Sequence, residues 1–510
     1  MALVLGLRYV TKVCYFNPVI RLRVRSVWNM QATKSGRILL FLEDIFHLKE
    51  VGPLANSERK CKAFCTFYEK LMPQEKSVFL QILSRDYGIN QELVMKTSRN
   101  FISSKTSELS LLKAGEMLRN ALTPQYKQLF VNIGRIEGGV KFLVDLRGDV
   151  LHEMTVTGLN QDSPHLRILN YSLRELLSLW FSVGLLNLQR ITWQSPCDMV
   201  QKISEYEAVH PIRNWTDLKR RVGSYRRCFV FIHNAMPREP VVVLHTALTD
   251  TIPSSIHSII KSNIRRSTSV ETVPLEDDPE TELTDDISTA VFYSITSTQK
   301  GLQSVDLGNY LIKRVVRELQ AEFPHMSVFT SLSPVPGFRD WLLKEITKKI
   351  QLMHLGEQMD MSLFAQEDIY NLRGYFDLNT MAGLEKLKKT LQTNSWYQEE
   401  QLNVLLKNPL MRLCAQYLYV EKRRGYALNP VANFHLGNGA VLWRLNWLAD
   451  VSPRGLGQSC SMMVNYRYFL DESEKNSLNY LECQQIPASS QVTDLVADVK
   501  KDFSTDNAPV

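Results

Sequence analysis

Residues 288–295 read Ser-Thr-Ala-Val-Phe-Tyr-Ser-Ile, and residues 328–338 read Val-Phe-Thr-Ser-Leu-Ser-Pro-Val-Pro-Gly-Phe. Both stretches contain short β-branched and aromatic runs, which predict buried strands over residues 290–295 and 327–330. The segment between them repeats apolar side chains at helical spacing: Ile312, Val316, Leu319 and Phe323. The order strand, loop, helix, strand therefore predicts a mixed α and β domain.

The loop inside this unit, residues 303–309, places Gly308 just before the predicted helix. Free N–H groups and the positive end of the helix dipole at such a position suit a phosphate or pyrophosphate. The competing interpretation is a glycine that only lets the chain turn into the helix. The residues of the loop alone leave both interpretations open.

The length and charge of the chain restrict its class. A chain of 510 residues is expected to form two or three domains, and no apolar run is long enough to span a membrane. The net charge of +7 comes from seven bases that precede the first acid, Glu43: Arg8, Lys12, Arg21, Arg23, Arg25, Lys34 and Arg37. The remainder is neutral overall, which argues against a nucleic-acid surface.

The acid-free N-terminus mixes arginines with apolar residues, which is the composition of a mitochondrial transit peptide. A secretory signal and a disordered tail are the alternatives, but residues 2–7 are too short for a secretory apolar region before Arg8. We expect residues 1–36 to be the transit peptide and the mitochondrial matrix to be the destination.

Eight cysteines occur without a CxxC pair. Cys61 and Cys65 are four residues apart on a predicted helix, but no histidine or acid of metal-ligand spacing lies beside them. We expect no metal site, and reduced thiols are the default for an intracellular protein.

The first part of the chain predicts an all-α bundle that extends to about residue 187. Apolar residues recur at helical spacing, and Ser57 and Pro73 are suited to helix starts. The predicted helices include residues 58–72, 107–121, 124–134, 139–147 and 166–187.

The pattern changes after Trp193. Residues 228–233 and 241–247 predict a hairpin whose loop contains Pro237 and Pro240. Residues 265–288 are rich in acids, which predicts a surface loop or a mobile insertion. Further helices are expected over residues 256–264, 338–353 and 384–423, and a hairpin turn at Gly437-Asn438-Gly439 before a strand over residues 440–448.

Two residues are candidates for chemistry. Ser333 precedes Pro334 at a predicted strand-to-helix turn, where its hydroxyl could simply cap the helix. His435 lies beside the predicted turn and is by itself as consistent with a structural role. Together with the phosphate-suited loop, however, they could place the reactive end of a long phosphorylated substrate near a hydroxyl and a proton donor. Walker, GxSxG and HExxH motifs do not occur.

Several long motifs give the chain a specific family resemblance. It resembles malonyl-CoA decarboxylases from about residue 57 to the C-terminal region. The motifs are Leu186-Asn-Leu-Gln-Arg-Ile-Thr-Trp-Gln-Ser-Pro-Cys197, Ala208-Val-His-Pro211, Gln303-Ser-Val-Asp-Leu-Gly308, Thr330-Ser-Leu-Ser-Pro-Val-Pro-Gly-Phe338, Arg424-Gly-Tyr-Ala-Leu-Asn-Pro-Val-Ala-Asn-Phe-His435 and Asn465-Tyr-Arg-Tyr-Phe-Leu470.

The resemblance implies an α+β protein with two domains: an N-terminal all-α helical bundle and a GNAT-like (N-acetyltransferase fold) catalytic domain. Three regions come after the expected transit peptide of residues 1–36. We expect the helical domain, which mediates oligomerisation, to cover residues 37–181, the catalytic domain to cover residues 182–490 and a C-terminal tail to cover residues 491–510.

The resemblance also implies roles for individual residues. Ser333 and His435 match the catalytic serine and histidine, and Ser294, Asp306 and Tyr468 match other active-site positions. Asp306 stands where related sequences can have Glu, and its shorter side chain makes a direct substrate contact doubtful. The implied coenzyme A loop consists of Gln303, Ser304, Val305, Asp306, Leu307, Gly308 and Asn309.

Cys197 matches a cysteine that forms an inter-subunit disulfide in oligomeric relatives. We therefore expect a homo-oligomer, as a tetramer built as a dimer of dimers. The C-terminus, Ala-Pro-Val, lacks the Ser-Lys-Leu tripeptide of some relatives, which argues against a peroxisomal location and leaves a cytosolic form open.

The implied substrate is malonyl-CoA, and the implied reaction is its decarboxylation to acetyl-CoA, which controls the malonyl-CoA level and fatty-acid metabolism. Loss of CO2 leaves an enolate, which needs oxyanion stabilisation and a proton at C2. No cofactor is expected, because the thioester is the electron sink. An acyltransferase and a non-catalytic CoA-binding protein on the same fold are the alternatives; transfer of an acyl label to an amine would reveal the first, and binding without turnover the second.

Overall fold

The structure is a computed structural model of the 510-residue chain. It describes residues 34–47, 54–104, 107–157, 163–260, 282, 284–305, 310–355 and 363–504. The proposed transit peptide up to residue 33, most of the acidic segment 265–288, residues 306–309 of the loop and the last six residues lie outside this description.

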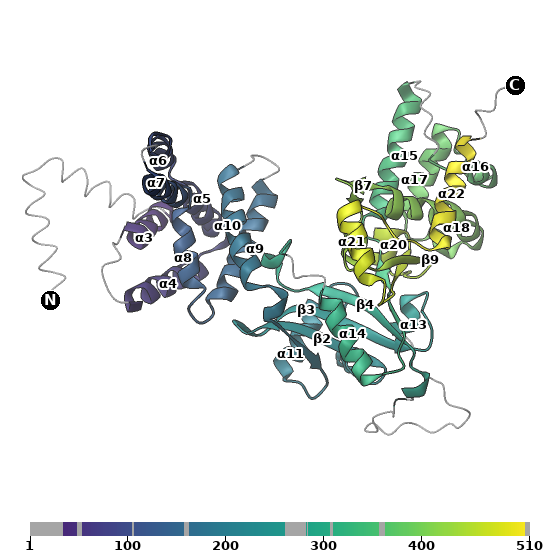
Figure 1. Cartoon of the computed structure of the whole chain (residues 1–510). Coiled ribbons are helices and arrows are strands. Elements are labelled where there is room, and N and C mark those ends of the chain that lie inside the picture. Colours follow the sequence, from purple (N-terminus) through teal and green to yellow (C-terminus); the bar gives the residue numbers. More distant parts are fainter. Residues whose placement is uncertain are drawn as a thin grey trace, which may run out of the picture. The chain divides into compact units, whose positions relative to one another are not determined.

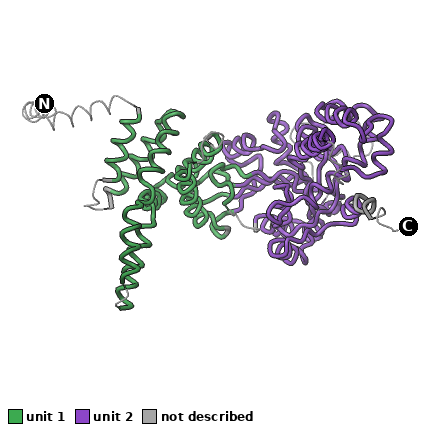
Figure 2. Tube along the Cα trace, turned by 90° about the horizontal axis from the view of Figure 1, so that it is seen from above, with its two compact units in different colours: residues 1–187, 232–241, 297–307 green, residues 188–231, 242–296, 308–510 purple. Residues whose placement is uncertain are grey.

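The chain divides into two compact units (Figure 2). Residues 1–187, 232–241 and 297–307 form unit 1, and residues 188–231, 242–296 and 308–510 form unit 2. Unit 1 therefore contains the helical part together with two short later segments.

Unit 1 is built from helices, as the sequence predicts (Figure 1). Local caps explain where several of them begin: Asn90 accepts from the Leu93 N–H, and Ser107 accepts from the Ser110 N–H. Fully buried side chains that include Phe64, Phe79 and Phe130 form the core. The helices are α3 (Lys34–His47), α4 (Leu54–Glu69), α5 (Pro73–Asp86), α6 (Gln91–Ser103), α7 (Glu108–Ala121), α8 (Gln125–Ile133), α9 (Gly139–Thr157) and α10 (Pro164–Trp180), with 3-10 turns η1 (Val183–Leu185) and η3 (Lys300–Leu302).

A mixed sheet forms the centre of unit 2 (Figure 1). Its strands lie in the order β1-β2-β3-β4-β5-β10-β6, and β9 pairs with β10. The strands are β1 (Leu186–Ile191), β2 (Arg226–His233), β3 (Met236–Thr249), β4 (Thr289–Ser297), β5 (Val328–Ser331), β6 (Ser333–Pro334), β9 (Val441–Asn446) and β10 (Met463–Tyr468); β7 (Lys422–Arg423) pairs with β8 (Tyr426–Ala427) in a second sheet.

Most helices of unit 2 follow strands β1, β2 and β3 in the chain. The last helix packs against both β9 and α18. The helical elements are α11 (Cys197–Tyr206), α12 (Trp215–Arg221), α13 (Ile256–Ile260), η2 (Thr284–Asp286), α14 (Tyr310–Glu322), α15 (Phe338–Leu355), α16 (Gln366–Leu372), α17 (Met381–Gln392), η4 (Trp396–Gln398), α18 (Glu400–Ala415), η5 (Gln416–Val420), α19 (Pro430–Gly437), α20 (Pro453–Ser459), α21 (Ser473–Cys483) and α22 (Ser490–Ser504).

The parallel strands β4 and β5 part at a defined point. Their pairing ends with Phe292 opposite Ser331, where the Leu332 N–H still donates to the Phe292 carbonyl at 3.1 Å. Beyond this point Ser333 pairs instead with Val464 of β10. Ser294 on β4 and Ser333 on β6 both follow the point of separation.

Several local predictions are wrong. Ser57 does not start a helix, because α4 already begins at Leu54. Pro237 and Pro240 do not lie in a hairpin loop, because β3 begins at Met236 and contains both. Gly437-Asn438-Gly439 is not a hairpin turn either: Asn429 caps helix α19, and Asn438 ends it before Gly439 at φ +82°. A helix forms here and not a hairpin turn, because Asn429 and Pro430 provide a favourable helix start in which the Asn429 side chain accepts from the first N–H groups.

Candidate functional site

Ser333 lies in β6, where its side chain is 6% exposed. Its hydroxyl donates to the Ser331 hydroxyl at 2.9 Å, and Ser331 Oγ also accepts from the Tyr466 N–H at 3.3 Å. Ser333 is therefore held by strand β10 and not used as the helix cap that its position before Pro334 suggested.

His435 reaches Ser333 from helix α19. The Asn429 side chain accepts from the N–H groups of Val431 and Ala432, and its amide donates to the Pro336 carbonyl at 2.9 Å. The cap of α19 is thereby joined to the turn that follows Ser333. As a result, His435 Nε2 lies 2.9 Å from Ser333 Oγ, although 102 residues separate them.

Two tyrosines of β10 complete the surroundings of His435. The Tyr468 hydroxyl lies 2.7 Å from His435 Nδ1, and the Tyr466 ring stacks on the imidazole with centroids 4.5 Å apart and planes 16° apart. Ser331, Ser333, His435 and Tyr468 thus form one continuous chain of hydrogen bonds. We call these four residues the serine-histidine chain.

Burial sets the protonation of this chain. It lowers the pKa of His435 to about 3 and raises the pKa of Tyr468 well above its usual value. Both groups are therefore neutral at pH 7. When the Tyr468 O–H donates to Nδ1, the neutral imidazole has its N–H at Nε2, facing Ser333. The arrangement can pass a proton without holding a charge.

Ser294 lies in a different environment. It is buried on β4, and its hydroxyl donates to both oxygens of Glu207, at 2.9 and 2.8 Å. The same carboxylate accepts from the N–H groups of Val209 and His210, each at 2.8 Å, and lies 3.3 Å from His245 Nε2. Ser294 is thus one of several donors around a buried anion.

The charge of this second cluster is also defined by its contacts. Burial disfavours the Glu207 carboxylate, but His245 and the three hydrogen-bond donors lower its pKa below the usual range. Burial lowers the pKa of His245 to about 4, against the opposing effect of Glu207. The cluster therefore consists of an anionic Glu207 and a neutral His245 at pH 7.

Glu207 was missed by the sequence reasoning. The motif Ala208-Val-His-Pro211 begins one residue after it, so the neighbouring motif was the available signal. A single glutamate carries no sign in the sequence of the partners that it will meet, here directly after α11. Only the fold brings Ser294 to it.

The structure describes residues 303–305 of the predicted coenzyme A loop, which come directly after η3. Val305 is buried, whereas Gln303 and Ser304 are exposed. Asp306, Leu307, Gly308 and Asn309 lie outside the described residues.

Cys197 is exposed at the start of α11 and is a free thiol. The described cysteines contain no disulfide within this chain. Within the same described ranges, the structure contains no cluster of three or more His, Cys, Asp or Glu side chains suited to a metal ion. No helix among the described residues is long and apolar enough to cross a membrane.

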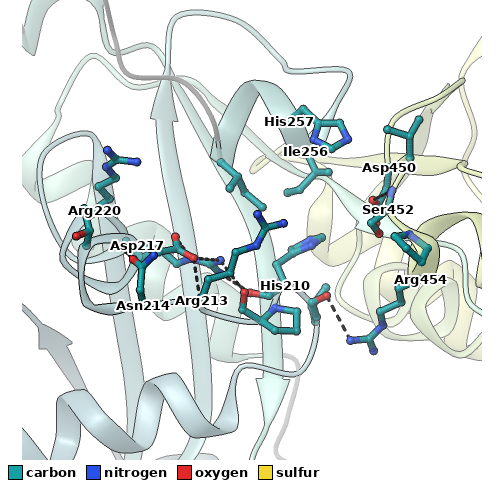
Figure 3. A pocket seen from close by; sticks show the side chains of 17 residues that line it. His210, Arg213, Asn214, Asp217, Arg220, Ile256, His257, Asp450, Ser452 and Arg454 are labelled. Atoms are coloured by element: carbon teal, nitrogen blue, oxygen red, sulfur yellow. Dashed lines mark hydrogen bonds and ion pairs between the residues drawn. The ribbon is translucent and has the colours of Figure 1, made fainter.

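A hollow of about 980 Å³ lies beside the Glu207 cluster (Figure 3). Its sides come from the segment around α12, from α13 and from the turn between β9 and α20. Arg213, Arg220 and Arg454 line it together with His210. The excess of arginine suits a small anionic molecule, but Ser333 and His435 do not line this hollow.

Comparisons with known proteins agree with these features. The model of the malonyl-CoA decarboxylase N-terminal domain matches residues 87–181, and that of the C-terminal domain matches residues 184–506. The chain is 46% identical over 460 residues to the mitochondrial malonyl-CoA decarboxylase of Anser anser anser, which covers 89% of this chain and 86% of that protein. The corresponding protein of Rattus norvegicus is also 46% identical, over 456 residues, with 89% and 88% covered.

Solved structures show the same similarity. The crystal structure of malonyl-CoA decarboxylase from Rhodopseudomonas palustris is 31% identical, with a TM-score of 0.74, and covers 90% of this chain and 99% of that one. The structure from Agrobacterium vitis is 29% identical with a TM-score of 0.71 and the same coverage. The predicted fold class, a helical bundle followed by a GNAT-like mixed domain, is confirmed.

Proposed function

Because this chain belongs to the malonyl-CoA decarboxylase family, we propose that Ser333, His435 and Tyr468 form the centre at which it releases CO2 from malonyl-CoA. The protein is a carboxy-lyase that converts malonyl-CoA to acetyl-CoA and CO2. The observation that carries the assignment of residues is the 2.9 Å contact between Ser333 and His435 within one buried chain of hydrogen bonds.

The chemistry asks for two contributions from the protein. When the bond between C2 and the carboxylate breaks, its electron pair moves into the thioester and gives an enolate while CO2 leaves. Hydrogen-bond donors must stabilise the enolate oxygen, and a proton must then reach C2. No cofactor is needed in this scheme, because the thioester accepts the electron pair.

The serine-histidine chain can supply that proton. His435 is the proton donor, either directly or through the Ser333 hydroxyl: its Nε2 proton goes to C2 while its Nδ1 takes the proton of Tyr468, and water restores the Tyr468 proton after CO2 has left. A neutral donor in a buried site suits an enolate, since it adds no competing charge before the proton moves. Ser333 also orients the departing carboxylate in this proposal.

Residues 303–309 hold the coenzyme A part of the substrate in the same proposal. The loop precedes α14, and the start of a helix in general suits phosphate oxygens. Control of the malonyl-CoA level, and so of fatty-acid metabolism, follows from this activity.

The proposal is tested by CO2 release from malonyl-CoA in wild type, Ser333→Ala and His435→Ala. Ser327→Ala and His354→Ala are matched controls, because both residues are exposed on the surface of the same unit. We expect loss of release only in the first pair. An acyl label transferred to an amine, without CO2, would instead support the acyltransferase alternative, and CoA binding without turnover the non-catalytic one.

We also propose a homo-oligomer, built as a tetramer from two dimers. Helices α6 and α7 expose large apolar side chains, among them Ile102 at 68% and Leu112 at 65% exposure. Such a surface favours a partner of the same chemistry. Light scattering will give the subunit number, and a non-reducing gel of Cys197→Ser beside wild type will test whether exposed Cys197 links two subunits.

The mitochondrial matrix is the proposed location, because the relatives with 46% identity are named mitochondrial. Residues 1–36 are the proposed transit peptide. A fusion of these residues to a reporter should enter mitochondria, and a reporter that stays cytosolic would contradict the assignment.

A further inference from the structure

Arg147 lies in the middle of α9 and is 1% exposed. Its Nε donates to Asn170 Oδ1 at 3.0 Å, its Nη1 donates to the Gly301 carbonyl, and its Nη2 donates to the Gln303 carbonyl at 2.9 Å. Two of the three contacts are therefore made to the backbone where the proposed coenzyme A loop begins.

The partners of this guanidinium in the described ranges are oxygens of amides and not of carboxylates. Burial lowers the pKa of Arg147 to about 10, and the charge of Arg174 adds to the effect, so Arg147 stays protonated at pH 7. A buried charge without an opposite charge is costly unless its hydrogen bonds are satisfied. The backbone carbonyls of the loop meet that requirement.

Residues 302–305 form a tight turn of type II. The Val305 N–H donates to the Leu302 carbonyl at 3.0 Å, Gln303 has φ −55° and ψ 130°, and Ser304 has φ +60°. The third position of such a turn normally holds glycine, because other residues are strained at positive φ. Ser304 occupies it without that freedom.

The turn is seated directly on α9. A Cβ atom added to Gly301 would lie 1.7 Å from the Val144 carbonyl oxygen, so only glycine allows this approach. The N–H of Gly301 also lies close to Gly148 of the same helix. Helix α9 therefore fixes the position of the turn, and Arg147 acts on its orientation.

The orientation of one peptide group depends on this contact. The central peptide of the turn directs the Gln303 carbonyl to Arg147, and in a trans peptide the N–H of Ser304 points the opposite way. This N–H therefore points away from Arg147, on a residue that is exposed. Rotation of the peptide into a type I turn would reverse both groups.

We infer that Arg147 is a positioning residue of the substrate site: it holds the 303–304 peptide so that the Ser304 N–H is presented to a phosphate oxygen of coenzyme A. The inference rests on the proposed function, which assigns residues 303–309 to coenzyme A. The hydrogen bond from Arg147 offsets the strain of serine at positive φ.

The test compares two ligands that differ in their phosphates. Calorimetry measures the Kd of coenzyme A and of pantetheine, which lacks the phosphates, for wild type, Arg147→Met, Arg147→Lys and the double variant Arg147→Met with Ser304→Gly. Arg119→Met on exposed α7 is the control. We expect Arg147→Met to raise the Kd of coenzyme A at least about tenfold and to leave that of pantetheine within about twofold.

Glycine should restore the binding, because it adopts positive φ without strain. We expect Ser304→Gly to recover at least about half of the lost affinity on a logarithmic scale, and Arg147→Lys to lie between wild type and Arg147→Met. Equal losses for both ligands, or no recovery with glycine, would overturn the inference and leave Arg147 a purely structural residue.

A second variant keeps the test decisive if Arg147→Met does not fold. Ser304→Val changes only an exposed residue, and a β-branched side chain opposes positive φ, so it should weaken coenzyme A binding selectively while Arg147 is intact. An unchanged Kd in Ser304→Val overturns the inference. If wild type decarboxylates malonyl-CoA but binds coenzyme A no tighter than pantetheine, the loop assignment fails first and this inference with it.

Discussion

Ser333 and Ser294 are two buried serines that follow the same separation of strands β4 and β5, yet their partners differ in kind. Ser333 contacts a neutral histidine and a second hydroxyl, whereas Ser294 donates to both oxygens of a carboxylate. A proton can move only through groups that both donate and accept. In the proposed function Ser333 belongs to a proton pathway, whereas Ser294 is one of the donors that hold an anion.

The largest expected effect separates the two serines by activity. Ser333→Ala and His435→Ala should lower kcat for CO2 release by about 10²–10⁴-fold, the usual contribution of general acid–base groups. Ser294→Ala should lower kcat by less than Ser333→Ala, because Glu207 keeps its backbone donors. Steady-state assays decide this, and a reversed order would end the distinction between the two sites.

The second prediction concerns stability at the Ser294 cluster. Glu207→Gln removes a buried anion that accepts from Ser294, Val209 and His210, and it should cost about 2–3 kcal/mol of unfolding free energy. Urea unfolding measures the loss, with exposed Glu205→Gln as control. Equal stability of the two variants would mean that the carboxylate is not the centre of this cluster.

The third prediction tests the role of the Tyr468 hydroxyl in the serine-histidine chain. Tyr468→Phe deletes the hydroxyl that lies 2.7 Å from His435 Nδ1 and keeps the ring. We expect kcat to fall about tenfold, equivalent to about 1.4 kcal/mol, with little change in KM. A change confined to KM would assign Tyr468 to substrate binding and not to the orientation of His435.

The smallest expected effect is a pH dependence of stability. The folded pKa of His435, about 3, is far below the value of about 6.5 expected in the unfolded chain, so the unfolded state takes up the proton first as pH falls. Stability should therefore decrease below about pH 6.5 and continue to decrease toward pH 3. His435 accounts for about 0.7 kcal/mol between pH 7 and pH 6.

Urea unfolding of wild type and His435→Gln at pH 7 and pH 6 measures that contribution by difference. Buried His245 and His210, whose pKa values burial lowers to about 4, add to the total decrease but are present in both proteins. An identical pH dependence in the two proteins would show that His435 titrates normally in the folded state.

Local patterns were enough to predict much of the fold. The runs around Phe292 and Phe329 form strands β4 and β5, and the apolar spacing that includes Val316 forms helix α14. These elements follow from periodicity, which depends only on near neighbours in the chain. The turn at Gly437-Asn438-Gly439 failed because two local signals competed, and the cap at Asn429 prevailed.

The site was less accessible to sequence reasoning. Ser333 and His435 were singled out as candidates, but their 2.9 Å contact depends on the Asn429 contact with Pro336 and on strand β10. Glu207 and Arg147 were not predicted at all. Both act on residues more than 80 positions away, and no periodicity or spacing within a single segment reports such a contact.

A double-mutant cycle on kcat for CO2 release shows whether Ser333 and His435 act as one unit. We expect the double variant Ser333→Ala with His435→Ala to be no slower than the slower single variant, because either substitution already breaks the proposed proton pathway. Multiplication of the two single losses in the double variant would contradict this expectation and show that the residues act independently.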